Sequence, residues 1–420
     1  MNARLACRFC ASPLREIFAD LGTTPLANSY VSAERVAKSP EASYPLVARL
    51  CTECLLVQVE DVVPPSAIFS DYAYFSSYSA AWVEHARRYA EAMRKRLNLG
   101  PQSKVVEIAS NDGYLLKHFV AAGIPVVGVE PAANVAAVAA ANQVPTEVAF
   151  FGRDTAERLA KAGHSADLMA ANNVLAHVPD LNDFVAGFKR LLKPQGVATF
   201  EFPHLLRLIA QVQFDTIYHE HFSYFSLLTA ERVFARHGLR VFDVEELPTH
   251  GGSLRLFVGH EGAGQKEGAG LFTVRAAESA AKLNEPASYR GFQARVDKVK
   301  DGFLKFLDDA KRQGRQVAAY GAAAKGNTLL NYCGVGTDRI AYVVDRNPHK
   351  QGLLLPGSHL PIFGPEKVFE TKPNDLVILP WNVADEVARE MAGIRAWNGR
   401  FVIAVPEIRF IAGVGGGGAK

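Results

Sequence analysis

The middle of the chain alternates between short apolar runs and amphipathic stretches. The apolar runs lie at 104–108, 125–129, 166–171 and 196–202, and helical spacing fills 113–121, 134–141 and 181–192. This alternation predicts a parallel sheet covered by helices. Two further strands, at 239–247 and 253–260, are separated by a short turn, so we expect an antiparallel hairpin that closes the sheet.

The chain on either side of this block has other patterns. Residues 1–72 are loop-rich with short strands, and an amphipathic helix at 79–97 follows them. After a polar stretch at 261–285, a long helix runs from about 289 to 311. A second α/β unit then has strands at 316–320, 340–345, 375–380 and 401–405. We therefore predict an α/β protein with modules at 1–72, 73–285 and 286–412, and a disordered glycine-rich tail at 413–420.

Charge and composition narrow the choice of partners. The 420 residues carry 46 Lys and Arg against 43 Asp and Glu, a net charge of +3. Such a balance gives no electrostatic argument for nucleic acid or a membrane surface. The chain has no apolar run of about 18 residues and no signal-like N-terminus, so we expect a cytoplasmic protein in a reducing compartment.

Four of the five cysteines form two Cys-x-x-Cys pairs, Cys7 with Cys10 and Cys51 with Cys54. Each pair can point two thiolates at one ion, and two pairs complete a tetrahedral zinc site. Four thiolates leave no open coordination position, so this zinc would be structural. Four unrelated buried cysteines are the alternative, and Cys333 is expected to be an ordinary core residue.

The first predicted strand and the loop after it carry two acids, Glu107 and Asp112. In a doubly wound sheet, ligands bind at the carboxyl ends of strands near the topological switch. Negative charge there would repel a pyrophosphate but suits a sulfonium or an amino group. Glu130 ends the second strand, where an acid can bind adenosine ribose hydroxyls, although an exposed carboxylate is the alternative. The loop matches neither Gly-x-Gly-x-x-Gly nor Walker A, and we predict an S-adenosylmethionine site.

Polar residues also follow the strand at 166–171. Asn172, Asn173 and His177 stand where the sheet should open into a pocket, although one asparagine can instead cap a helix. The predicted donor-binding residues are Glu107, Ser110, Asn111, Asp112, Gly113, Glu130, Asn172, Asn173 and Tyr78.

Ionisable and aromatic side chains are densest in the segment 218–225, Tyr-His-Glu-His-Phe-Ser-Tyr-Phe. Apolar surroundings shift pKa values and allow acid–base chemistry near neutrality. A His-x-His metal site and a buried, hydrogen-bonded histidine cluster are the alternatives. A second aromatic cluster, at 71–78, is either core packing or a lid that carries a tyrosine hydroxyl.

An ordered set of motifs resembles a known family over nearly the whole chain. After the cysteine pairs come Tyr74-Phe-Ser-Ser-Tyr-Ser79, Glu107-Ile-Ala-Ser-Asn-Asp-Gly-Tyr114, Asn172-Asn-Val-Leu-Ala-His177, Tyr218-His-Glu-His221, His250-Gly-Gly-Ser-Leu-Arg255 and Tyr320-Gly-Ala-Ala-Ala-Lys325-Gly-Asn327. This set resembles the sugar C-methyltransferases, which act on nucleotide-linked 4-keto-deoxysugars, and among them the dTDP-sugar C-3-methyltransferases of antibiotic pathways. The family's first donor-loop glycine is Ala109 here, which leaves the path of that loop open.

The resemblance implies a fold and a reaction. It implies a zinc-binding N-terminal module, a central class I S-adenosylmethionine-dependent methyltransferase domain with a Rossmann-like sheet, and a second Rossmann-like domain that helps to hold the sugar nucleotide. Loss of a proton beside a ketone gives an enolate, and its carbanion can attack a sulfonium methyl. His221 is the candidate base, with Tyr218 as partner or alternative and Glu220 as the group that orients the histidine. His177 and Tyr72 are expected to stabilise the enolate or position the donor.

The C-terminal unit carries the predicted substrate contacts. Backbone amides in 317–327 suit a diphosphate and Lys325 adds charge, although a purely structural turn is the alternative. The candidate substrate-binding residues are His250, Arg255, Tyr320, Gly321, Lys325, Asn327 and Asn382. The partner would be a dTDP- or GDP-linked keto-sugar, bound by a monomer or homodimer. The competing functions are an O- or N-methyltransferase, a zinc-ribbon scaffold without activity, and a nicotinamide oxidoreductase.

Overall fold

The computed structural model describes residues 5–64 and 75–411, and within them the chain forms two compact units. The first unit combines the described parts of residues 1–15, 51–206 and 222–288. The second combines residues 16–50, 207–221 and the chain from 289 onward. The units are interleaved along the sequence, and the three-module division stays a prediction. The tail at 413–420 lies outside the described residues.

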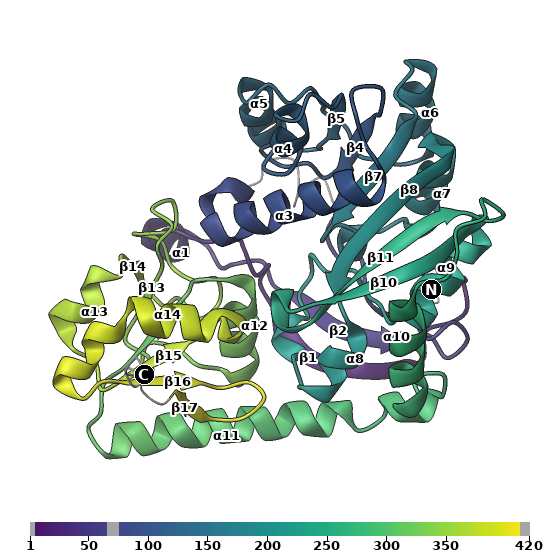
Figure 1. Ribbon diagram of the computed structural model, residues 1–420. Coiled ribbons are helices and arrows are strands. Elements are labelled where there is room, and N and C mark those ends of the chain that lie inside the picture. The colour runs from purple at the N-terminus through teal and green to yellow at the C-terminus, as the bar shows by residue number, and fades with distance from the viewer. Residues whose placement is uncertain (1–4, 65–74, 412–420) are drawn as a thin grey trace, which may run out of the picture. The chain divides into compact units, whose positions relative to one another are not determined.

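The first unit is built on a sheet whose described strands number seven. They are β4 (Val105–Ile108), β5 (Val126–Val129), β6 (Thr146–Glu147), β7 (Ala166–Asn172), β8 (Leu192–Pro203), β10 (Leu239–Leu247) and β11 (Ser253–His260). Their order is β10-β11-β8-β7-β4-β5-β6 (Figure 1). β4 to β8 run parallel, and β10 and β11 form the predicted antiparallel hairpin beside β8. The strand order reverses between β4 and β7, so their carboxyl ends form a crevice.

Helices cover both faces of this sheet. They are α3 (Ala80–Arg96), α4 (Leu116–Val120), α5 (Ala133–Ala141), α6 (Arg153–Lys161), α7 (Leu181–Leu191), α9 (Leu227–Arg236) and α10 (Ala269–Ala280). β7 shows why two layers form, because its successive side chains point to opposite faces. Leu168 and Ala170 join the core that includes α3, whereas Met169 and Ala171 join the core that includes α7.

Helix α3 illustrates how the local sequence sets the element boundaries. Ser79 caps its first turn by accepting a hydrogen bond from the Trp82 amide, and Ala86, Tyr89 and Met93 bury its apolar stripe. The helix predicted from 113 begins later, at Leu116. The delay follows from left-handed backbone conformations in the preceding loop, which reaches to Gly113 at φ +78°.

The second unit has a sheet of its own, with six strands among the described residues. They are β12 (Val317–Tyr320), β13 (Val343–Val344), β14 (Ile362–Phe363), β15 (Asp375–Ile378), β16 (Arg400–Ile403) and β17 (Arg409–Ile411), in the order β14-β13-β12-β15-β16-β17. β17 runs antiparallel to β16, and the other pairs run parallel. The order reverses between β12 and β15, which gives this sheet a switch-point crevice as well.

The other elements of the second unit come from three parts of the chain. They are β1 (Glu16–Thr24), α1 (Ala33–Lys38), β2 (Tyr44–Leu50), η3 (Phe214–Thr216), α11 (Phe292–Arg312), α12 (Ala324–Cys333), α13 (Glu366–Thr371), η6 (Trp381–Val383) and α14 (Ala384–Glu390). β1 and β2 pair antiparallel. At the crevice, Gly321 has φ +93°, and an added Cβ would lie 2.5 Å from Pro380 Cδ, so the loops after β12 and β15 need glycine to pack this closely. Among the described helices, none has the length and apolarity needed to cross a membrane.

Candidate functional site

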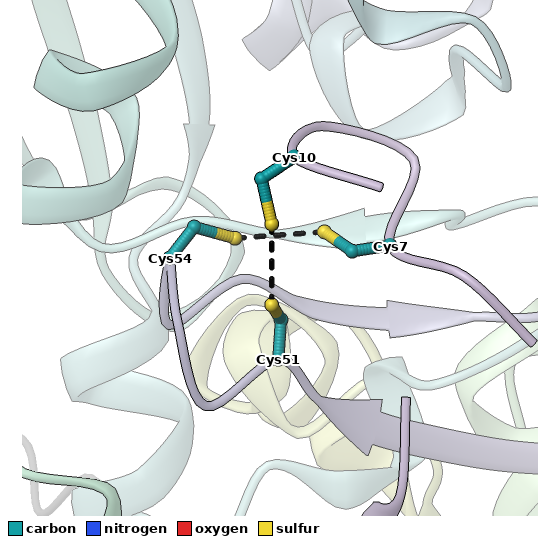
Figure 2. A group of neighbouring side chains, drawn as sticks. All are labelled: Cys7, Cys10, Cys51 and Cys54. Atoms are coloured by element: carbon teal, nitrogen blue, oxygen red, sulfur yellow. Dashed lines mark hydrogen bonds between the residues drawn. The ribbon is translucent and has the colours of Figure 1, made fainter. Parts of the chain in front are cut away.

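The four paired cysteines converge on one point in the first unit (Figure 2). Their Sγ atoms all lie within 4.8 Å of one another, and the Cys7–Cys54 and Cys10–Cys51 sulfur pairs are each 3.5 Å apart. A tetrahedral zinc with bonds of about 2.3 Å separates its sulfurs by about 3.8 Å. The cluster therefore fits a closed Cys₄ zinc site, as predicted from the doubled spacing.

Two turns of the same construction hold these cysteines. In the first, the Ala11 amide donates to the Cys7 carbonyl at 2.9 Å, and Ala11 has φ 63°. In the second, the Leu55 amide donates to the Cys51 carbonyl at 2.8 Å, and Leu55 has φ 66°. Each turn aims both of its sulfurs inward, and the two turns together supply the four ligands.

Buried carboxylates gather at the carboxyl ends of β4 and β5. Glu107 is 1% exposed, and Asp112 and Glu130 are buried as well. Glu107 Oε2 and Asp112 Oδ1 have no hydrogen-bond partner among the described residues. Burial raises the pKa of Glu107 well above its usual range, and the negative charges of Glu130 and Asp112 raise it further. Buried like charges are unfavourable alone, so the site suits a cationic ligand with N–H or O–H donors.

The loop between β4 and α4 is held from both sides. The Glu130 carboxylate accepts the Asn111 amide at 3.0 Å and the Ala132 amide at 2.9 Å. On the other side, η1 (Ser76–Tyr78) donates two backbone amides, from Ser76 to Asn111 Oδ1 and from Ser77 to Asp112 Oδ2. These bonds define the path of the loop, in which Ala109 stands at φ 56°.

The remaining predicted donor contacts lie close to this loop in the same unit. Ser110 is buried, and its Oγ lies where a Cβ on Gly128 would approach to 2.4 Å, so glycine lets β5 lie against the loop. Asn172 ends β7, and Asn173 follows at φ 54° with its amide bonded to the Glu201 carbonyl at 2.7 Å. Their side-chain oxygens lack partners in the described chain, so both can bind a ligand.

Three other predicted residues lie outside the donor loop and the end of β7 in the sequence. His177 is half-buried at the end of η2 (Leu175–His177), in the loop that follows Asn173. Tyr78 is 62% exposed at the end of η1, with its ring 5.4 Å from that of Phe75. Tyr72 lies outside the described residues.

The histidine-rich segment belongs to the second unit up to His221. The Tyr218 hydroxyl lies 2.7 Å from His221 Nε2, and the ring centroids are 3.9 Å apart. His221 Nδ1 lies 2.8 Å from the Thr216 carbonyl oxygen. A carbonyl can only accept, so Nδ1 carries a proton and Nε2 of the neutral ring is the basic nitrogen.

Glu220 has a different partner from the one expected. It is buried, and its Oε1 accepts a hydrogen bond from Asn28 Nδ2 at 2.6 Å. Burial raises the pKa of Glu220 to about 7, and the Asn28 bond opposes this rise. The group that orients His221 is therefore the Thr216 carbonyl, which the sequence pattern did not reveal.

The crevice of the second sheet holds a lysine among polar and aromatic groups. Lys325, in the first turn of α12, donates to Asn382 Oδ1 at 3.0 Å, and its Nζ lies 4.7 Å from the centre of the Trp381 ring. Burial lowers the pKa of Lys325 to about 8, while the charge of Asp215 opposes this. Two predicted substrate contacts, Lys325 and Asn382, thus lie together at the switch point.

Two other predicted substrate contacts, Arg255 and Asn327, have hydrogen-bond partners within the chain. Arg255 is buried, and its guanidinium binds Glu201 at 2.8 Å and Glu245 at 2.9 Å, so its charge is already compensated. Asn327 is buried and donates to the Ala27 carbonyl at 2.9 Å. These bonds stabilise the hairpin and α12, and the substrate-binding role of both residues stays a prediction.

Two more residues of that predicted set lie in different units. The ring of Tyr320 is buried at the end of β12, and its hydroxyl donates to Glu390 at 3.3 Å. His250 stands at φ 54° in η4 (Thr249–Gly251) of the first unit, with its ring 5.6 Å from Trp82. Sequence reasoning missed Asp215 and Asn28, because an isolated polar residue carries no motif that marks its partner. Ser76 and Ser77 stand in the quoted motif 74–79, but the motif did not reveal that they bind the donor loop.

Family models match three successive parts of the chain. Residues 7–69 match a family described as "Putative zinc binding domain", residues 82–244 match "Methyltransferase domain", and residues 248–406 match "C-methyltransferase C-terminal domain". The first match contains the four-cysteine cluster, and the second contains the acidic donor loop.

The chain is also similar to individual proteins, over different shares of its length. The chain is 35% identical over 406 residues to C-methyltransferase NovU of Streptomyces niveus, covering 97% of this chain and 96% of that protein. It is 30% identical over 95 residues to a ubiquinone biosynthesis O-methyltransferase of Bartonella bacilliformis, covering 22% and 38%. The magnesium protoporphyrin IX methyltransferase structure from Synechocystis PCC 6803 aligns at TM-score 0.32 and 14% identity, over 42% of this chain and 80% of that one. On the whole-length match, this chain belongs to the C-methyltransferase family and is an S-adenosylmethionine-dependent methyltransferase.

Proposed function

We propose that this enzyme methylates a carbon beside the ketone of a nucleotide-linked 4-keto-deoxysugar, through an enolate. The observation that carries the proposal is the Tyr218–His221 pair, whose Nε2 is the basic nitrogen. A C-methyltransferase must remove a proton from carbon, whereas transfer to a hydroxyl or an amine requires no such step. A histidine with a fixed tautomer suits that proton transfer near neutral pH.

The hydrogen bonds of Tyr218 and His221 indicate the path that the proton would take. Tyr218 donates its hydroxyl proton to His221 Nε2, because Nδ1 is the protonated nitrogen. As the tyrosine oxygen takes the substrate proton, its own proton passes to Nε2, and the C–H electron pair stays on the substrate as the enolate. The histidine then holds the positive charge while Thr216 continues to accept its Nδ1 proton. Both roles considered for Tyr218 and His221 are combined in this relay.

The donor loop would bind the second substrate in the other unit. S-adenosylmethionine supplies an electrophilic methyl group on a cationic sulfur. Glu107 and Asp112 provide the carboxylate oxygens that lack partners in the described chain, and these suit the cationic sulfonium and ammonium groups. Asn172 and Asn173 offer side-chain oxygens at the end of β7, and Glu130 keeps free lone pairs for ribose hydroxyls.

The crevice of the second sheet is the proposed place for the nucleotide diphosphate. Lys325 supplies a positive charge in the first turn of α12, whose N-terminal amides point toward the same crevice. Asn382 holds the Lys325 ammonium and is itself polar enough to contact a ligand. The zinc cluster has no open coordination position, so we assign it to folding of the first unit rather than to the reaction.

The decisive experiment separates proton removal from methyl transfer. Purified enzyme is incubated in D₂O with S-adenosylhomocysteine and each of a panel of dTDP- and GDP-linked 4-keto-6-deoxysugars. We expect deuterium at the carbon beside the ketone of one sugar, followed by a methyl group on that carbon when S-adenosylmethionine replaces the inhibitor. Methylation on oxygen or nitrogen without exchange would contradict the proposal and favour the O- or N-methyltransferase alternative.

Two variants test the relay. His221→Asn removes the final acceptor and should abolish exchange. Tyr218→Phe removes the group that touches the substrate and should lose exchange to a similar degree, about 10²–10⁴-fold, as for a general base. If Tyr218→Phe exchanged at the wild-type rate, His221 would be the direct base and the relay would be wrong.

A further inference from the structure

Asp215 is a buried carboxylate that the reaction scheme above leaves unused. It is 0% exposed in η3, six residues before His221. Trp381 Nε1 donates to Asp215 Oδ2 at 2.7 Å, and Oδ1 has no hydrogen-bond partner in the described part of the chain. A buried carboxylate is costly, so its retention calls for a reason beyond packing.

Asp215 is joined to the His221 side chain through the backbone of its neighbour Thr216. Asp215 directly precedes Thr216 in η3, and the Thr216 backbone N–H donates to the Gln213 carbonyl at 3.1 Å. The carbonyl of the same Thr216 accepts the Nδ1 proton of His221 at 2.8 Å, and His221 Nε2 meets the Tyr218 hydroxyl at 2.7 Å. Whatever fixes the Thr216 backbone therefore also fixes the tautomer and the ring direction of His221.

On its other side, the Asp215 carboxylate interacts with Trp381 and Lys325, which belong to the crevice of the second sheet. Trp381 follows β15, and the positive charge of Lys325 faces both its ring and Asp215. The lysine charge compensates the carboxylate, and the Trp381 N–H fixes the carboxylate direction. Burial still raises the pKa of Asp215 to about 6, while Lys325, Trp381 and the two backbone amides oppose the rise.

We infer that Asp215 and Trp381 are positioning residues for His221, which hold the Thr216 carbonyl where it accepts the Nδ1 proton and so keep Nε2 basic. The inference rests on the proposed function, because it assigns a purpose only if His221 is the final proton acceptor of the relay. The segment 207–221, which carries Asp215 and His221, belongs to the same unit as the C-terminal sheet. The base is tied to the crevice proposed for the nucleotide.

The test removes one N–H while keeping the aromatic ring. Trp381→Phe retains a ring beside Lys325 but loses the Nε1 donor to Asp215. Loss of a hydrogen bond to a charged group predicts a fall of about tenfold to a hundredfold in kcat and in deuterium exchange. KM for both substrates should stay within about twofold, because the ligand contacts remain. A general loss of folding would lower the amount of active enzyme without slowing exchange per folded molecule.

A matched control is available in the same unit. Trp397 Nε1 donates to the Pro373 carbonyl at 2.9 Å, and its ring packs in the same core, so Trp397→Phe removes an equivalent bond and equivalent volume. We expect its exchange rate to equal that of wild type. Equal slowing in both variants, or no slowing in Trp381→Phe, would overturn the inference.

A second variant keeps the test open if Trp381→Phe is poorly folded. Asp215→Asn keeps an acceptor for Trp381 Nε1, so it should retain more exchange than Asp215→Ala, and identical losses would count against positioning. The base assignment is judged separately with His221→Asn. Normal exchange in His221→Asn would refute the proposed function. If His221→Asn loses exchange while Trp381→Phe exchanges normally, only the positioning role is refuted.

Discussion

The two switch points of this molecule share a construction but differ in charge. In each sheet, an acidic residue at the end of the second strand in chain order accepts hydrogen bonds from two backbone amides. One of these amides belongs to the loop that follows the first strand. Glu130 accepts the Asn111 and Ala132 amides, and Asp345 accepts the Ala322 and Asn347 amides, each at 2.8–3.0 Å. An acid at this position therefore serves the loop in both sheets. By itself it does not identify the ligand.

The side chains around the two loops differ in charge, and this difference bears on the ligand proposed for each crevice. The first loop has Glu107 and Asp112, with carboxylate oxygens that lack partners in the described chain. The second has Lys325, and Lys350 donates to the Ala322 carbonyl at 2.7 Å. The same topology thus gathers acidic side chains in one crevice and places a lysine beside the Asp215 carboxylate in the other. The proposed cationic methyl donor suits the first crevice, and Lys325 is the group that would bind the proposed anionic nucleotide in the second.

The largest expected effect comes from removing the negative charge of Glu107, which tests whether the first crevice binds the cationic donor. Glu107→Gln keeps the shape of a residue that is 1% exposed but removes the negative charge. We expect affinity for S-adenosylmethionine to fall about tenfold to a hundredfold, as for a lost charged hydrogen bond. Isothermal titration calorimetry measures it, with nucleotide affinity as the internal control. Unchanged donor affinity would separate Glu107 from the donor site.

Removing the positive charge of Lys325 in the second crevice should weaken binding of the nucleotide sugar. Lys325→Gln is expected to raise KM for the nucleotide sugar about tenfold, while donor affinity stays at the wild-type value. The pKa of Lys325 is lowered to about 8, so its positive charge is lost as pH rises through that value. Wild-type KM should therefore rise between pH 7 and pH 9. Lys325→Arg should flatten this profile, and a wild-type-like rise in that variant would assign the titration to another group.

The sequence predicted those features that have local signals. Buried strands such as 166–171, the paired cysteines and the small-residue loops can each be recognised from a few neighbouring residues. The sequence could not pair Asp215 with Trp381, since 166 positions separate them. Nor could it show that Arg255 meets two acids, because such partners arise only when the hairpin docks beside β8. The donor loop was predicted more completely than the second crevice for this reason.

The acidic loop should also make stability depend on pH in the absence of ligand. Burial raises the pKa values of Glu107 and Glu130, so the folded state keeps protons that the unfolded chain releases. Stability is then full below the ordinary pKa of glutamate, about 4.3, and falls as pH rises toward the raised values. Thermal unfolding between pH 5 and 8 should show this slope, and Glu107→Gln should reduce it. An identical slope in the variant would mean that other groups dominate.

The smallest expected effect concerns the backbone of the donor loop. Ala109 stands at φ 56°, where a residue with a Cβ is strained by about 1–2 kcal/mol and glycine is not. Ala109→Gly removes this strain but gives the unfolded chain more freedom, which costs about 0.4–1 kcal/mol. We expect a net gain in the free energy of unfolding of no more than about 1 kcal/mol, with donor affinity unchanged. Ala121→Gly, at φ −59° in the right-handed region, is the matched control and should only destabilise. A loss at Ala109 as large as at Ala121 would mean that the left-handed conformation is not the source of strain, and that this alanine contributes through its contacts instead.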